Sequence, residues 1–236
     1  MRRLTFPHTS RPAVTTSLRL LRCLPFLLLA ACGGGSGPER PATAPAPVIP
    51  VRPFAPLLAQ QVVVAPTQSL RESDALGWTR QVPRSRELLR ALDSAIATEL
   101  GERGIARQWV FPADLVRAAK ASPSYGQDPY TLAVGPLRAG DIPPGTPVGS
   151  PLGMQIRTMV ALQENARAVL LPVELRFEPD SVPGRGVAVL RLALLDGRLG
   201  EVRWIGDVRS DPSPTFSRAV LLTSVAAHFA DLITAP

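Results

Sequence analysis

The sequence predicts an α/β domain, with a mixed sheet of about five strands and helices packed on it. Two observations predict this fold. Five short segments are β-branched or alternate apolar and polar residues, as strands do, and four longer segments repeat apolar residues at helical spacing. Along the chain the elements run strand, helix, strand, helix, long loop, helix, three strands, helix. Such interleaving is typical of α/β domains.

The first half of the domain contributes two strands and two helices. Residues 62–64 are a β-branched run ended by proline, which predicts a buried strand, and residues 108–111 predict a short second strand. Between them, Ser85 is expected to cap a helix whose apolar residues recur every four positions up to Leu100. Pro112 is expected to begin a helix that stops before the next proline.

The second half is expected to hold one helix, three strands and a closing helix. The helix is predicted to open at Ser150-Pro151 and run to about residue 164. The strands are predicted at residues 168–177, 187–195 and 201–209, with the last two joined as a hairpin, and the closing helix at 214–233.

The strand at 168–177 has a clear alternation. Val169 and every second residue up to Phe177 are expected to share one face, with Glu174 and Arg176 on the other. Pro172 cannot donate a ladder hydrogen bond, so it indicates an edge position or a bulge.

A long loop at residues 122–149 is rich in proline and glycine. A loop of this length in a compact domain is either functional or covers the core. Its aromatic segment supplies the best candidate interface, since it combines two tyrosines with a constrained backbone. Trp78, in an earlier loop, marks a second binding surface or packs in the core. The candidate interface residues are Trp78, Tyr125, Asp128 and Tyr130.

Residues 1–31 have the layout of a secretory signal. Five arginines without an acidic residue precede the end of an apolar stretch at residues 23–31. As a helix this stretch rises about 14 Å, against roughly 30 Å of bilayer hydrocarbon, so it is too short to span a membrane. It ends in Leu29-Ala30-Ala31-Cys32, before a Gly/Ser-rich run. An ordinary cleaved signal with a chance cysteine at the cut is the alternative interpretation.

This tetrapeptide resembles the lipobox of bacterial lipoproteins. The resemblance implies cleavage between Ala31 and Cys32 and two or three acyl chains on Cys32, which anchor stably where one chain holds only marginally. It implies a periplasm-facing protein of the cell envelope, and Gly33 after the cysteine favours the outer membrane. Residues 32–58 are then a disordered Gly/Pro-rich linker, and residues 59–236 a single periplasmic α/β domain.

The order of elements is also similar to that of several periplasmic lipoprotein domains. The shared features are a strand ending in proline, a long amphipathic helix, the strand at 166–176 and the Glu-Val-Arg-Trp sequence at 201–204. Over roughly residues 60–234 the chain resembles the amino-terminal domain of the Tol–Pal translocation protein, the curli-secretion lipoprotein and the lipoprotein activator of penicillin-binding proteins. The resemblance implies a role in binding envelope proteins or in assembly, and carries over no functional residue.

Charge and cysteine content restrict the partners. The chain has 26 Lys and Arg against 19 Asp and Glu, a net charge of +7. Residues 1–31 hold five of the arginines, so 21 basic residues stand against 19 acidic ones in the rest, a net charge of +2. No basic stripe with aromatic platforms is evident, so nucleic acid is not an expected partner. After residue 31 the sequence has one cysteine, Cys32, which is expected to be acylated, and one histidine, His228. Neither a metal site nor a cofactor is therefore expected.

Catalytic constellations are not evident either. A Ser-His-Asp triad would need His228, yet the sequence has no Gly-x-Ser-x-Gly elbow, and a Ser–Lys dyad would need Lys120 on an exposed helix face. Asp207 and Asp211 could pair for acid–base chemistry, although turn and capping roles are favoured.

The leading hypothesis is a non-enzymatic, lipid-anchored envelope protein whose domain binds another protein or self-assembles. Two alternatives stay open. One is a binding module for a small molecule or peptidoglycan fragment, with the 122–149 loop as a lid, which a pocket beneath that loop would favour. The other is a carboxylate-dependent hydrolase, which needs two carboxylates about 5–10 Å apart in a cleft.

Overall fold

The computed structural model describes residues 52–234 except 106, 124–125 and 164–165. The sheet has five strands in the order β2-β1-β3-β4-β5. β1 pairs in parallel with β2 and β3, whereas β3–β4 and β4–β5 are antiparallel. The strands are β1 (Val62–Val64), β2 (Trp109–Val110), β3 (Ala168–Pro179), β4 (Gly186–Asp196) and β5 (Glu201–Arg209). The helices are α1 (Ser85–Glu102), α2 (Pro112–Ala121), α3 (Leu152–Ala161) and α4 (Arg218–Asp231).

This arrangement confirms the predicted α/β class and the mixed five-stranded sheet. Three short 3₁₀ turns add to it, at Ala55–Ala59, Thr79–Gln81 and Gly135–Leu137. None of the helices in the described part of the chain has the length and apolar character needed to cross a membrane.

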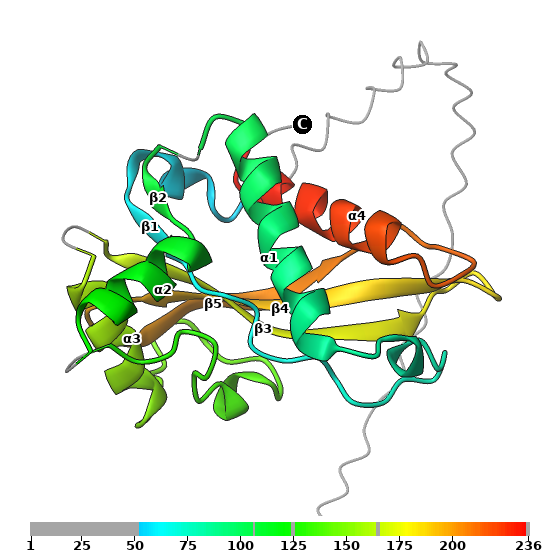
Figure 1. The fold of residues 1–236 in the computed structure, drawn as a ribbon, viewed down its shortest axis with the longest axis horizontal. Helices are drawn as coiled ribbons and strands as arrows, with labels where there is room; N and C mark the ends of the chain where they lie inside the picture. The colour runs from blue at the N-terminus through cyan, green and yellow to red at the C-terminus, as the bar shows by residue number, and fades with distance from the viewer. Residues whose placement is uncertain (1–51, 106, 124–125, 164–165, 235–236) are drawn as a thin grey trace, which may run out of the picture. The chain divides into compact units, whose positions relative to one another are not determined.

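The sheet separates two apolar cores. In Figure 1, α1 and α4 lie together on one side of the strands and α3 lies on the other. The first core is built on fully buried side chains such as Leu92 of α1 and Phe229 of α4. The second joins Ile156 of α3 to Leu115 of α2 and to apolar residues of the long loop. Each helix therefore buries one stripe against the sheet, as its periodicity predicts.

Strand β3 contains a bulge that exchanges its two faces. The register shifts between Pro172 and Glu174, inside a strand that is paired on both sides. From Val169 to Val173 alternate residues join the α3 core, whereas from Leu175 onward they join the core of α1 and α4. The prediction of one shared face is therefore wrong beyond the bulge, because one extra residue shifts the alternation by one position.

Three helix starts differ from the predicted ones. Ser85 is the first residue of α1 and not its cap, which is Arg84. Helix α3 starts at Leu152, one residue later than predicted, and its cap is Pro151 where Ser150 was expected. Helix α4 starts at Arg218, because Ser213 is still bound to the start of β4 through a pair of backbone hydrogen bonds with Gly186, each 2.8 Å.

The folded part also begins before residue 59. Phe54 is fully buried, and its backbone N–H donates to the carbonyl of Leu232 at 3.1 Å. Its ring meets Trp204 edge-on, with centroids 4.9 Å apart. The described residues of the expected linker, 52–58, therefore belong to the domain.

Candidate functional site

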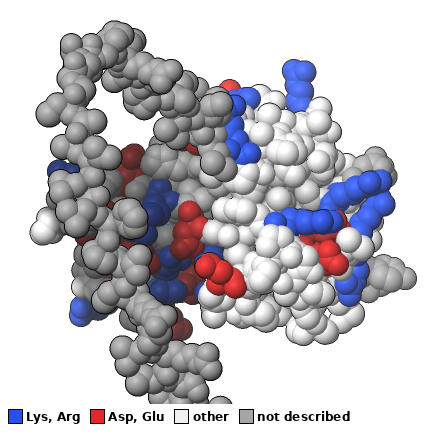
Figure 2. All heavy atoms as spheres, turned by 180° about the vertical axis from the view of Figure 1, so that it is seen from behind, with Lys and Arg blue, Asp and Glu red and all other residues white. Residues whose placement is uncertain are grey.

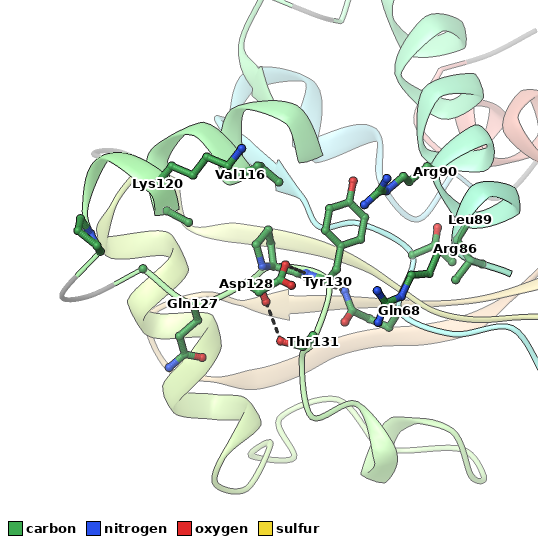
Figure 3. Close-up of a pocket in the computed structure, with 15 residues that line it drawn as sticks. Gln68, Arg86, Leu89, Arg90, Val116, Lys120, Gln127, Asp128, Tyr130 and Thr131 are labelled. Atoms are coloured by element: carbon green, nitrogen blue, oxygen red, sulfur yellow. Dashed lines mark hydrogen bonds between the residues drawn. The ribbon is translucent and has the colours of Figure 1, made fainter. Parts of the chain in front are cut away.

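A pocket of about 670 Å³ lies between α1, α2 and the first part of the long loop (Figure 3). Its lining comprises Arg86, Leu89 and Arg90 of α1, Val116, Ala119 and Lys120 of α2, Pro123, loop residues 126–131, and Thr67-Gln68 after β1. In Figure 3 the ring of Tyr130 stands between the side chains of α2 and Arg90 of α1. The volume is within the usual range for ligand-binding pockets.

Gln68 fixes the loop that forms one wall of the pocket. Its side-chain Nε2 donates to the carbonyl oxygens of Pro66 and Pro129, at 2.7 and 2.9 Å. Its Oε1 accepts the backbone N–H of Leu132 at 2.8 Å. One amide thus ties the chain after β1 to both ends of the Tyr130 segment, which keeps that wall in place without a ligand.

The loop is also fixed from within and from α2. The N–H of Tyr130 donates to Oδ1 of Asp128 at 3.0 Å, and the hydroxyl of Thr131 donates to the Asp128 carbonyl at 3.1 Å (Figure 3). Gly126 lies directly on α2, where an added Cβ would be 2.3 Å from the carbonyl oxygen of Ala119. Only glycine fits this close approach.

Thr67 and Gln68, the lining residues that follow β1, form what we call the floor of the pocket. Asp93 is hydrogen-bonded to this floor and is 7% exposed. One of its oxygens accepts both the N–H and the hydroxyl of Thr67. Burial raises the pKa of Asp93 to about 6, despite the opposing effect of these hydrogen bonds and of Arg90. Burial, followed by the nearby Asp93 charge, also raises the pKa of Tyr130, so its hydroxyl stays protonated at neutral pH.

The pocket carries an excess of positive charge. Arg86, Arg90 and Lys120 are exposed, and no ion pair joins them to a carboxylate of the described residues. The Arg90 guanidinium lies 5.5 Å from the centroid of the Tyr130 ring, a cation–π contact that leaves its charge available. Asp128 is the sole carboxylate among the described lining residues. The site is therefore suited to an anionic ligand.

The remainder of the long loop has a different role. Leu132, Val134, Leu137 and Val148 are buried in the core beneath α3. The loop thus lines a pocket in its first part and covers the core in the rest, so the core-covering role is confirmed for the latter residues and a functional role of the former stays a prediction.

Two of the four expected interface residues, Asp128 and Tyr130, line this pocket. Tyr125 lies outside the described residues, as do Ala31 and Cys32 at the expected cleavage and lipidation site. Trp78 is not part of the pocket lining. It is 6% exposed and packs against Phe177 and Phe216, with centroids 5.8 and 6.0 Å apart, so its ring offers no surface to a partner.

Sequence reasoning missed the basic side chains of the pocket. Arg86 and Arg90 lie one turn apart on the face of α1 that the apolar pattern leaves to solvent, and Lys120 was assigned to a solvated face. No sequence signal singled out the two arginines, because Arg90 has Glu87 and Asp93 three positions away on the same helix and so resembles an ordinary surface residue with acidic neighbours.

His228 lies near Asp211, which is bound to Ser224, but the three residues are not arranged as a catalytic triad. Its Nε2 is 3.7 Å from Asp211 and its Nδ1 is 2.6 Å from the Arg209 carbonyl. The hydroxyl of Ser224 donates to Asp211 at 2.8 Å and not to the histidine. The histidine therefore cannot activate this serine as a general base.

Beyond the bulge, the face of β3–β5 opposite α1 and α4 carries charges that neutralise one another. Arg176 donates to Glu178 and to Asp207, each at 2.6 Å. Arg191 donates to two backbone carbonyls of the long loop. In Figure 2, basic and acidic side chains likewise lie next to one another on the visible face. This surface differs from the pocket, where the cations lack ionic partners among the described residues.

Comparison with known proteins gives similarity of fold alone. No family model and no curated protein matches the chain. Similar solved structures include the PelC dodecamer from Paraburkholderia phytofirmans, at 16% identity over 75% of this chain and 91% of that one, with a TM-score of 0.36. Lipoprotein GNA1162 from Neisseria meningitidis is 19% identical over 73% of this chain and 99% of that one, with a TM-score of 0.34.

The C-terminal domain of LpoB from Salmonella enterica is 12% identical over 66% of this chain and 93% of that one, with a TM-score of 0.34. The chain therefore has a structural similarity, at low identity, to bacterial envelope lipoproteins. Because these TM-scores are below 0.5, the similarity does not bear on activity or partners.

Proposed function

We propose that the protein is a lipid-anchored, non-catalytic envelope protein whose domain binds another protein at the pocket between α1 and α2. The observation that carries the proposal is the preformed pocket with three cations that lack ionic partners among the described residues. The partner is another envelope protein or a second copy of this chain. Cys32 supplies the anchor, in the outer membrane, and the domain faces the periplasm.

The composition of the pocket supports a binding role over a catalytic one. Its described lining contains neither histidine nor cysteine, and Asp128 lacks a second carboxylate in the lining with which to share acid–base work. Among the described residues, no group of three or more histidine, cysteine or acidic side chains is placed to hold a metal ion.

Site-specific photo-crosslinking tests the binding role. A photoreactive residue at Gln127, on the exposed pocket rim, is expected to give a discrete protein adduct in intact envelopes. The same residue at Arg185, in the turn between β3 and β4, should give none. Equal yields from both positions, or no adduct above background from Gln127, would contradict the proposal.

Fractionation tests the anchor separately. Cys32→Ala is expected to move the protein from the membrane fraction to the soluble periplasm. A variant that still sediments with membranes would refute lipidation as the attachment.

A second candidate function is the binding of a small molecule or peptidoglycan fragment in the same pocket. The pocket volume and the loop wall above it favour this alternative. Native mass spectrometry of the protein purified from envelopes distinguishes the two. A retained small mass that disappears in Arg90→Gln supports the small ligand, and a protein adduct from Gln127 supports the protein partner.

A further inference from the structure

We infer that the pocket binds an extended acidic segment of a partner protein, in which carboxylates alternate with apolar side chains. The inference rests on the proposed function and names the chemistry that the partner must carry.

Charge is the first reason. Three cationic side chains face a single carboxylate, that of Asp128, in the described lining of the pocket. One oxygen of that carboxylate is already occupied by the N–H of Tyr130. A partner that places carboxylates against the cations therefore gains charge-assisted contacts without first breaking an ion pair of the described residues.

The placement of the cations is the second reason. Arg86 and Arg90 come from α1, Lys120 comes from α2, and the ring of Tyr130 stands between Arg90 and the α2 side chains (Figure 3). A compact anion such as phosphate is held best by converging donors. The positive charges of this pocket instead lie on two separate walls, α1 and α2, and carboxylates spaced along an extended peptide can contact both.

Occupied backbone donors are the third reason. Anion cradles for phosphate use free backbone N–H groups. Here the N–H of Thr67 donates to Asp93, that of Tyr130 to Asp128, and that of Thr131 to the Asp128 carbonyl. The N–H of Gly126 donates to the carbonyl of Ser122. These four N–H groups are therefore not available to an anion, whereas the basic side chains are.

The apolar residues of the pocket lining are the reason for expecting apolar side chains between the carboxylates of the partner segment. Leu89, Val116 and the ring of Tyr130 lie among the cations and would cover an apolar side chain placed between two acidic ones. This chain's own linker is a poor match, because Glu39 is the single acidic residue at 32–51. The segment is therefore expected from a partner.

Fluorescence anisotropy tests the inference directly. The full-length protein in detergent micelles is titrated into a labelled, end-blocked peptide of alternating Glu and Leu, and into its Gln/Leu counterpart. The Glu peptide is expected to bind about tenfold more tightly than the Gln peptide. Inorganic phosphate at equal ionic strength is expected to compete no better than chloride.

Matched charge variants locate the binding. The double variant Arg86→Gln/Lys120→Gln is expected to weaken binding of the Glu peptide about tenfold. The control, Arg185→Gln/Arg198→Gln, removes two exposed charges outside the pocket and should change affinity less than about twofold. All four positions are exposed, so unchanged thermal unfolding will confirm that the variants fold.

Two results would overturn the inference. Equal binding of the Glu and Gln peptides would show that carboxylates are not recognised. Equal losses in both double variants would show attraction to overall charge instead of to the pocket. If either occurs while Gln127 still crosslinks a protein, the acidic-segment inference fails and the proposed binding function stands.

Discussion

The backbone N–H and the hydroxyl of Thr67 donate to the same oxygen of Asp93, at 2.8 and 2.7 Å. The other carboxylate oxygen is buried and has no hydrogen-bond partner among the described residues. Asp93 therefore ties α1 to the chain after β1, yet its ionised form is incompletely compensated. The same contact that fixes the pocket floor makes it sensitive to pH.

Stability is expected to fall as Asp93 ionises. Its pKa is raised from 3.8 to about 6, so the folded state binds the proton more tightly than the unfolded chain. The contribution is fully present below about pH 4 and is lost as the pH rises through 6, a change of about 3 kcal/mol. Urea unfolding of the wild type and Asp93→Asn between pH 4 and 7 isolates it. A constant difference between the two proteins would contradict this assignment.

Gln68→Ala should loosen the pocket wall. It removes the donors to Pro66 and Pro129 and the acceptor for Leu132, at an expected cost of about 1–3 kcal/mol. Hydrogen exchange at 126–132 should accelerate more than exchange in β4. Gln68→Glu, which sets a carboxylate oxygen against the carbonyl oxygens of Pro66 and Pro129, should accelerate this exchange at least as much as the alanine variant. Uniform acceleration over the whole domain would instead indicate global destabilisation.

Trp78→Ala is expected to destabilise the fold by about 3–5 kcal/mol without altering the pocket. The buried ring packs so closely on β4 that a Cβ on Gly186 would be 2.7 Å from it. Leu199→Ala, at an exposed apolar position, serves as the control and should change stability by less than about 0.5 kcal/mol. Calorimetry and peptide titration of the folded protein measure both effects. Lost binding at unchanged stability would reassign Trp78 to the interface.

Arg176→Met should cost about 1–3 kcal/mol, because it leaves Glu178 and Asp207 without their shared partner. The carboxylates are about one-third exposed, so solvent reduces the loss. Arg117→Met, which breaks an exposed pair with Asp114, is the matched control and should cost less than about 1 kcal/mol.

The cost of Arg176→Met should depend on pH in the opposite sense to that of Asp93. Burial would raise the pKa of Glu178 and Asp207, but hydrogen bonds and charge from Arg176 outweigh it and lower both. The stabilisation is therefore present above their usual 4.5 and 3.8 and is lost as the pH falls below that range. Unfolding at pH 3 and 7 checks this, and an equal cost at both would contradict it.

Sequence patterns predicted the four α-helices and five strands of the described residues, although not the three 3₁₀ turns, because each of these elements buries a definite side. Helix α1 illustrates this, since Leu88, Leu92, Ile96 and Leu100 are all buried. The bulge in β3 shows where the pattern stops being informative. Pro172 indicated an irregularity, but the exchange of faces after it depends on how β3 pairs with β4.

The pocket was only partly predictable for a related reason. Asp128 and Tyr130 stood out as polar and aromatic residues in a constrained loop. Arg86 and Arg90 carried no periodic signal, because solvent-facing positions tolerate most residue types. Gln68 acts on Pro129, 61 positions away, so its role exists only in the folded chain.

The pocket is formed by segments that lie far apart in the sequence. The hydroxyl of Ser69, directly after the pocket floor, donates to Val173 across 104 positions of sequence. The β3–β5 meander needs only short turns, whereas docking β1 beside β3 closes a long stretch of chain at an entropic cost. Binding at the proposed pocket therefore requires that the domain has folded completely. A chain in which β1 has not yet docked beside β3 lacks the floor of the proposed binding pocket.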